Sequence, residues 1–156
     1  MKYIEIFEYN KSPRSDRIDV SIVKNRLDKA IGPVGVIGVS SMLYVFYFED
    51  VGQCFYILSD RSKDSIHGYI MLINISNDIW QVKDAVVFDS NKGIGTTLYH
   101  FIVRKGNTAQ NVSTKRLMHD TQLSQQAEKL WKDKLVSSGL LRKIYDKKLD
   151  TVYDEK

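Results

Sequence analysis

The N-terminal half of the chain contains several short apolar segments with the residue types and spacing of strands. Segment 2–7 alternates between its two faces, 42–49 is rich in aromatic and β-branched residues, and 53–58, 66–73 and 79–88 are the other expected strands. Asp50-Val51-Gly52 and the stretch 74–78 are short enough to be tight turns between neighbouring strands. The pattern therefore predicts an antiparallel meander.

A helix is expected between the first strand and this meander. Asp19 is a good N-cap for it. The apolar residues that follow at helical spacing are Val20, Val23, Leu27, Ala30 and Ile31. Gly32-Pro33 should end the helix, and the glycine-bearing stretch 35–41 is expected to be a connection.

The C-terminal half changes to the helical period. One helical face is formed by Ile94, Leu98, Phe101 and Ile102. A further amphipathic helix is built on Leu123, Ala127, Leu130, Trp131 and Leu135. Ser124 is the candidate N-cap of this helix, and Gly139 is its C-terminal glycine.

Segments 115–119 and 140–153 are compatible with a short strand and with one or two closing strands. The order strand, helix, strands, helix, strand, helix, strand predicts an α/β (α+β) fold. Its sheet should be mixed, mostly antiparallel and flanked by helices. Strands and helices do not alternate strictly, so a doubly wound nucleotide-binding fold is not expected. The length of 156 residues fits a single domain, 1–156.

Composition and charge narrow the class of protein. The content of 43% apolar and 27% charged residues is that of a globular protein, and no apolar run approaches the about 18 residues of a membrane helix. Cys54 is the only cysteine and the histidines lack ligand spacing, so we expect no disulfide, no metal and a reducing cytoplasm. The net charge of +4 is small for a dedicated nucleic-acid binder but suits a small phosphorylated cofactor.

The most informative segment, 86–99, leads from a buried strand through Gly93 and Gly95 into a helix. Backbone N–H groups and the positive end of the helix dipole meet at such a turn, and glycine lets a phosphate approach the backbone. Lys92 and Thr96 can add a charge and a hydroxyl. The spacing of the P-loop and the third glycine of the dinucleotide fingerprint are both missing. The alternative interpretation is a glycine pair that only shapes a tight turn.

Lys92-Gly93-Ile94-Gly95-Thr96, followed by Leu98, resembles the coenzyme A loop of GNAT-type N-acetyltransferases, which reads Arg/Gln-x-x-Gly-x-Gly/Ala after a central strand. Further along, Leu123-Ser124-x-x-Ala127-x-x-Leu130-Trp131 and then Gly139 are similar to that family's next helix. The order of elements agrees over nearly the whole chain, whereas the motifs cover about 82–139. The chain looks most like the short, divergent members of the family that bacteriophages encode.

The resemblance implies a GNAT-like fold that binds acetyl-CoA (CoA). The cofactor-binding residues that it implies are Val86, Val87, Phe88, Lys92, Gly93, Ile94, Gly95, Thr96 and Ser124. Backbone groups of the first three would pair with the pantetheine arm as an added strand. Amides of the glycine turn would hold the pyrophosphate, and Ser124 would lie near the cofactor arm.

Two residues depart from the family's pattern. Ser90 stands where the family usually has Arg or Gln, so the phosphate site loses one cation. Trp131 stands where many members have the tyrosine that protonates the leaving thiolate, and an indole N–H is no acid at neutral pH. Both departures weaken the prediction of efficient catalysis, although acetyl transfer can also depend mainly on positioning and base catalysis.

Asp84 is the candidate catalytic residue. Simple alternation places it on one face of the strand with Trp80, Val82, Val86 and Phe88, which are all apolar. A carboxylate there loses hydration, which suits a general base that deprotonates the amine before it attacks the thioester. Many members of the family carry an acidic residue on this strand. A bulge, a solvated strand end or an ion pair with a buried arginine is the alternative.

The sequence thus predicts an N-acetyltransferase that uses acetyl-CoA and an amine acceptor, which can be a small molecule, a protein or a nucleic acid. The alternative is a non-catalytic protein of the same fold that binds a macromolecular partner, for example in the cytoplasm of a phage host. A weaker alternative is nucleic-acid binding through the region 104–116. No membrane association is expected, and a homodimer is compatible with the sequence.

Overall fold

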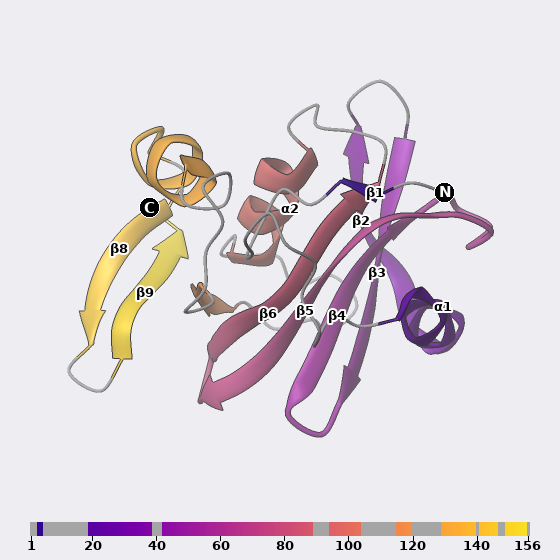
Figure 1. Ribbon diagram of the computed structural model, residues 1–156, viewed down its shortest axis with the longest axis horizontal. Helices are drawn as coiled ribbons and strands as arrows, with labels where there is room; N and C mark the ends of the chain where they lie inside the picture. The colour runs from indigo at the N-terminus through magenta and orange to yellow at the C-terminus, as the bar shows by residue number, and fades with distance from the viewer. Residues whose placement is uncertain are drawn as a thin grey trace.

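The strands of the described residues form one mixed, nine-stranded sheet in the computed structural model (Figure 1). The structure describes residues 3–4, 19–38, 42–88, 94–103, 115–119, 129–139, 141–146 and 149–155. The strand order is β2-β3-β4-β5-β6-β7-β9-β8, and β1 pairs with β6 beside this path. The coarse prediction of an α+β fold with a mostly antiparallel sheet is confirmed.

An antiparallel meander forms the larger part of the sheet. Its strands are β2 (Ile31–Gly38), β3 (Met42–Asp50), β4 (Gln53–Ser59), β5 (Ile66–Ser76) and β6 (Ile79–Phe88). Asp50 pairs with Gln53 around the turn that the sequence predicted. The turn between β5 and β6 is shorter than the predicted 74–78, because β5 continues to Ser76 and only Asn77 and Asp78 lie between the two strands.

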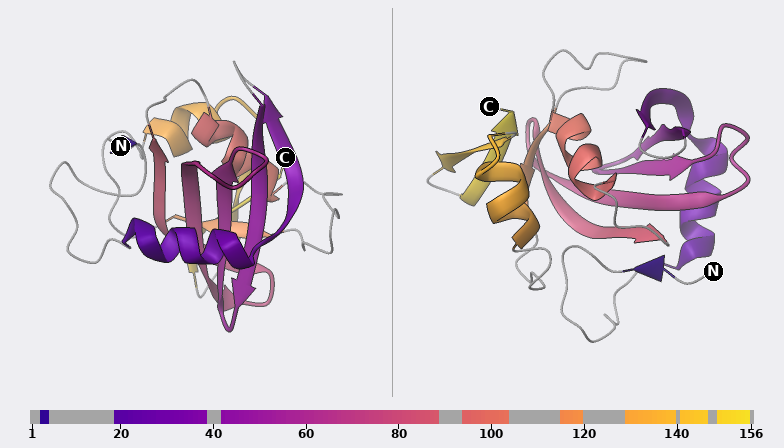
Figure 2. Two further views of the ribbon diagram at one scale, coloured as in Figure 1. Left: turned by 90° about the vertical axis from the view of Figure 1, so that its right-hand side faces the viewer. Right: turned by 90° about the horizontal axis from the view of Figure 1, so that it is seen from above.

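Two helices cover opposite faces of this meander. Helix α1 (Val20–Lys29) begins as predicted at Asp19, whose carboxylate accepts a hydrogen bond from the Ser21 amide at 2.8 Å. Helix α2 (Ile94–Val103) follows β6 and packs on the other face of the sheet (Figure 2). Among the described helices, none is both long and apolar enough to cross a membrane.

The expected connection over 35–41 is wrong for the part that the structure describes. Residues 31–38 form strand β2 at the edge of the sheet, and α1 already ends at Lys29. A glycine at position 35 fits a strand here because the Phe101 ring lies against its backbone; a Cβ would meet Phe101 Cε2 at 2.2 Å. The glycine permits a close approach of α2 to the sheet and does not mark a loop.

The C-terminal part extends the sheet beyond β6. Strand β7 (Arg116–Met118) pairs with β6 in parallel, and the hairpin of β8 (Leu141–Asp146) and β9 (Leu149–Glu155) follows it. The expected third helix is a π-helix, η2 (Leu130–Val136), over its described residues. Gly139 has φ +87°, as expected for a glycine that ends a helix.

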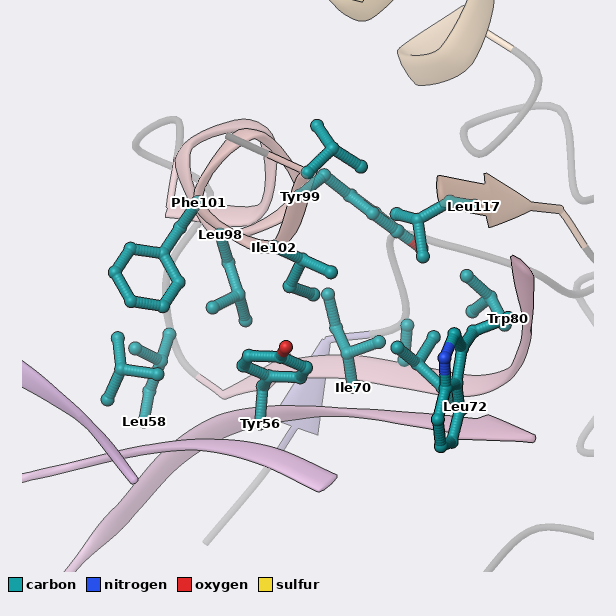
Figure 3. Packing of buried hydrophobic residues seen from close by; sticks show 14 of the residues in the cluster. Tyr56, Leu58, Ile70, Leu72, Trp80, Leu98, Tyr99, Phe101, Ile102 and Leu117 are labelled. Atoms are coloured by element: carbon teal, nitrogen blue, oxygen red, sulfur yellow. The ribbon is translucent and has the colours of Figure 1, made fainter. Parts of the chain in front are cut away.

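Buried side chains form a core on each face of the sheet. On the α1 face, Val23 and Leu27 pack on Phe46, Phe55 and neighbouring residues. On the α2 face, Leu98 and Ile102 lie over Tyr56, Ile70 and Leu72 (Figure 3). The larger of the two cores is on the α2 face and includes Trp131 and Leu135 of η2, so it joins the meander to the C-terminal hairpin.

The packing of η2 gives the first testable prediction. Leu135 is fully buried, as predicted, so Leu135→Ala should lower the free energy of unfolding by about 2–5 kcal/mol through lost burial and a residual cavity. Urea unfolding measures this change. Lys132→Ala, at an exposed position of the same helix, is the control and should leave stability nearly unchanged. Equal stability of both variants and the wild type would show that the face of η2 is assigned wrongly.

Candidate functional site

The two parallel strands β6 and β7 share only a short pairing. It covers three pairs, from Ile79↔Arg116 to Gln81↔Met118, after which β7 ends and β6 continues to Phe88. On the same edge of β6, β1 (Tyr3–Ile4) pairs only with Val87 and Phe88. Within the described residues, no strand pairs with residues 82–86 on this edge. Val87 and Phe88, the last two residues of β6, follow this stretch and pair with β1 on the same edge.

Most of the predicted cofactor residues lie at the end of β6 and at the start of α2. Of the three that were expected to pair with the pantetheine arm, only Val86 lies in the stretch that no described strand pairs with, because β1 pairs with Val87 and Phe88. Val86 and Val87 are buried in β6, and Phe88 is its last residue. Ile94, Gly95 and Thr96 form the first turn of α2, so their position at a helix N-terminus agrees with the sequence. Lys92 and Gly93 lie outside the described residues, as do Ser90 and Ser124.

The prediction that Asp84 shares a face with Trp80 and Val82 is wrong. Met71 pairs with Asp84 and Leu72 with Val82, so Lys83 is an extra residue of β6 and forms a β-bulge. A bulge of one residue reverses the alternation of side chains. Trp80 and Val82 therefore face α2, whereas Asp84 shares the α1 face with Met71 and Val86.

Asp84 is nevertheless buried, with 4% of its surface exposed. The Tyr69 hydroxyl of β5 donates a hydrogen bond to Asp84 Oδ2 at 2.8 Å, and Tyr69 itself belongs to the α1-side core. Asp84 also lies inside the stretch 82–86 of β6, with which β7 does not pair. A buried carboxylate thus lies beside the candidate site for an extended ligand. Its partner Tyr69 was not predicted, because the contact depends on the pairing of β5 with β6.

Lys115, the residue before β7, is fully buried on the α2 face of the sheet. Its Nζ lies over three rings, at 4.6 Å from Tyr47, 5.4 Å from Tyr56 and 5.1 Å from Trp80, and it donates to the Tyr47 hydroxyl at 3.0 Å. The Tyr47 hydroxyl in turn donates to the Glu49 carboxylate. Aromatic faces and a hydroxyl stabilise a cation that has lost its water. The local pattern around Lys115 gave no sign of this cluster.

Burial changes the proton affinities of this cluster. Loss of hydration lowers the pKa of Lys115 and raises the pKa of Tyr47 and of Tyr56 above their ordinary values. Burial also raises the pKa of the Cys54 thiol to about 12. Because a nucleophilic cysteine must be a thiolate, Cys54 is a buried apolar residue of β4 and no candidate nucleophile.

These pKa shifts predict that the protein loses stability at alkaline pH. A group whose pKa is raised on folding keeps its proton in the folded state, so stability falls once pH exceeds the pKa of the unfolded chain. Above about pH 9–10, the raised pKa values of Cys54, Tyr47 and Tyr56 lower the free energy of unfolding. The lowered pKa of Lys115 has the opposite effect, which ends at about pH 10.5, where a lysine of the unfolded chain loses its proton. Each group contributes about 1.4 kcal/mol per pH unit.

The free energy of unfolding should therefore fall steeply above about pH 10.5. Urea unfolding at several pH values between about 8 and 11.5, the range in which these groups titrate in the unfolded chain, measures how the free energy of unfolding changes with pH. Tyr56→Phe should reduce the slope, because it removes one of the three groups. A stability that stays constant over this range in the wild type would contradict the arrangement of the cluster.

Trp131 of η2 packs among aromatic rings of α2, β9 and the residue that follows β7. Its ring centroid lies 4.4 Å from that of Tyr153 and 4.9 Å from that of Tyr99, and His119 contacts both Trp131 and Tyr153. Only 2% of the Trp131 surface is exposed. The indole therefore connects α2, the residue that follows β7, η2 and β9 by packing.

Comparison of the chain with family models, with curated proteins and with solved structures gives no match. Function has to be inferred from the arrangement of the chain's own residues.

Proposed function

We propose that this chain is an acetyl-CoA-dependent N-acetyltransferase with a GNAT-like fold. The observation that carries the proposal is that no described strand pairs with residues 82–86 of β6 on the edge where β7 ends, a few residues before a helix that begins with Ile94-Gly95-Thr96. An extended pantetheine arm can add to a strand edge through backbone hydrogen bonds, and the helix N-terminus favours the pyrophosphate. The two halves of CoA would thus find suitable groups on adjacent elements.

In this proposal Asp84 is the general base. It lies two residues before Val86 on the stretch where the cofactor arm would bind, and it is buried away from bulk water. It would take a proton from the amine of the acceptor, directly or through a water, as the nitrogen attacks the thioester carbonyl. The C–N bond forms, the C–S bond breaks, and CoA leaves as the thiol once its sulfur gains a proton.

A second candidate function is a non-catalytic protein of this fold that binds a macromolecular partner. Trp131 favours it, because a packed indole stands where many GNAT-type N-acetyltransferases have the tyrosine that protonates the leaving thiolate. The indole contacts Tyr153 and Tyr99. The two candidates differ in an observable way. Only the enzyme should release free thiol from acetyl-CoA in the presence of an amine.

Calorimetric titration with CoA tests the proposed cofactor. We expect saturable binding with one CoA per chain, because the proposed site is built from one strand, β6, and one helix, α2. No binding heat at millimolar CoA, checked at two temperatures, would contradict the proposed function and leave partner binding as the better candidate. Saturable binding without thiol release would also favour the non-catalytic candidate.

A further inference from the structure

Tyr69 and Asp84 form a buried pair across the antiparallel strands β5 and β6. The Tyr69 hydroxyl donates to Asp84 Oδ2 at 2.8 Å, and the two residues are 1% and 4% exposed. Tyr69 pairs in register with Val86 and Met71 with Asp84, so the hydroxyl reaches diagonally along the α1 face. The bulge at Lys83 is what turns Asp84 toward this face.

The tyrosine ring is fixed by packing in the core on the α1 face of the sheet. Tyr69 belongs to the α1-side core with Val23 and Leu27 of α1 and with Phe55 and Ile57 of β4. A side chain packed in this way holds its hydroxyl at a defined point. A hydrogen bond from that point to one carboxylate oxygen restricts rotation of the Asp84 side chain about its terminal bond.

We propose that Tyr69 is a positioning residue, which orients the Asp84 carboxylate for proton abstraction from the amine acceptor; this rests on the proposed function. A general base must lie within hydrogen-bond reach of the proton that it takes, and small errors in its orientation reduce the rate strongly. Tyr69 does not touch the reacting atoms in this proposal. It acts only through Asp84.

The test compares Tyr69→Phe with Tyr56→Phe. Both tyrosines are fully buried on neighbouring strands, but Tyr56 faces α2 and lies on the opposite side of the sheet from Asp84. Release of thiol from acetyl-CoA is measured with spermidine, tobramycin and a lysine-containing peptide as the amines. Tyr69→Phe should lower kcat about 10- to 100-fold, the value of a hydrogen bond to a charged group, and leave the KM for acetyl-CoA unchanged.

The same substitution is then made in the Asp84→Asn background. If Tyr69 acts through Asp84, Tyr69→Phe should cause no further loss beyond about twofold there. An equal loss in both backgrounds, or a wild-type kcat for Tyr69→Phe, would overturn this inference while leaving the enzyme assignment intact. Failure of the wild-type protein to bind CoA, or to release thiol with any of the three amines, would instead count against the proposed function and against this inference with it.

Discussion

Replacing Asp84 by asparagine should lower turnover by about 10²- to 10⁴-fold, the usual cost of removing a general base. The amide keeps the size of the carboxylate and an oxygen that can accept from Tyr69, so the fold should persist. CoA affinity should change little, because the cofactor contacts are expected to come from backbone groups of β6 and α2. The rate of the variant should recover in part at high pH, where the amine acceptor loses its proton unaided.

Thiol release at pH 7 and at pH 9–10, with acetyl-CoA saturating, measures both effects. Asp28→Asn removes an equivalent charge from an exposed position of α1 and is the matched control. Full activity of Asp84→Asn at pH 7 would show that another group takes the proton. A loss that is the same at all pH values would indicate a defect in structure, which the unfolding free energy can confirm.

Replacing Gly95 by glutamate should abolish CoA binding. Gly95 is the second residue of α2, in the turn whose amides are expected to face the pyrophosphate. A side chain there would occupy the space of the phosphates, and its carboxylate would repel them. The change should leave stability nearly unaffected, because a negative charge in the first turn of a helix is favourable and glutamate is a better helix former than glycine.

The matched control for this substitution is Val51→Glu. Val51 is 96% exposed in the β3–β4 turn, so this variant adds the same charge at a distance from α2. Calorimetry should give wild-type affinity for Val51→Glu and no binding for Gly95→Glu. Equal affinity of both variants would mean that the start of α2 does not hold the phosphates.

Local patterns were sufficient to predict the elements that carry their own periodicity. The apolar segments 42–49 and 53–58, which are rich in aromatic and β-branched residues and flank a predicted turn, correspond to β3 and β4, and the cap at Asp19 to the start of α1. Strand β2 was missed because Gly35 is explained by a contact with Phe101, which lies far away in the sequence. A glycine that admits a neighbouring ring and a glycine that shapes a loop cannot be distinguished from one sequence.

The candidate site was predicted only in part, for a similar reason. The burial of Asp84 agrees with the sequence, but its face does not, because nothing in the local pattern around Lys83 predicts a bulge. The contact of Tyr69 with Asp84 and the ring cluster around Lys115 depend on strand register and on packing between distant segments. Such contacts follow from the whole fold and leave no trace in hydrophobic periodicity.

The central claim is that CoA binds along β6 and at the start of α2. Amide chemical shifts of ¹⁵N-labelled protein, recorded during addition of CoA, test it most directly. We expect the largest changes at Val86, Val87, Gly95 and Thr96, and little change at α1 or in the β3–β4 turn. Absence of any change, or changes confined to α1 and that turn, would contradict the proposed site.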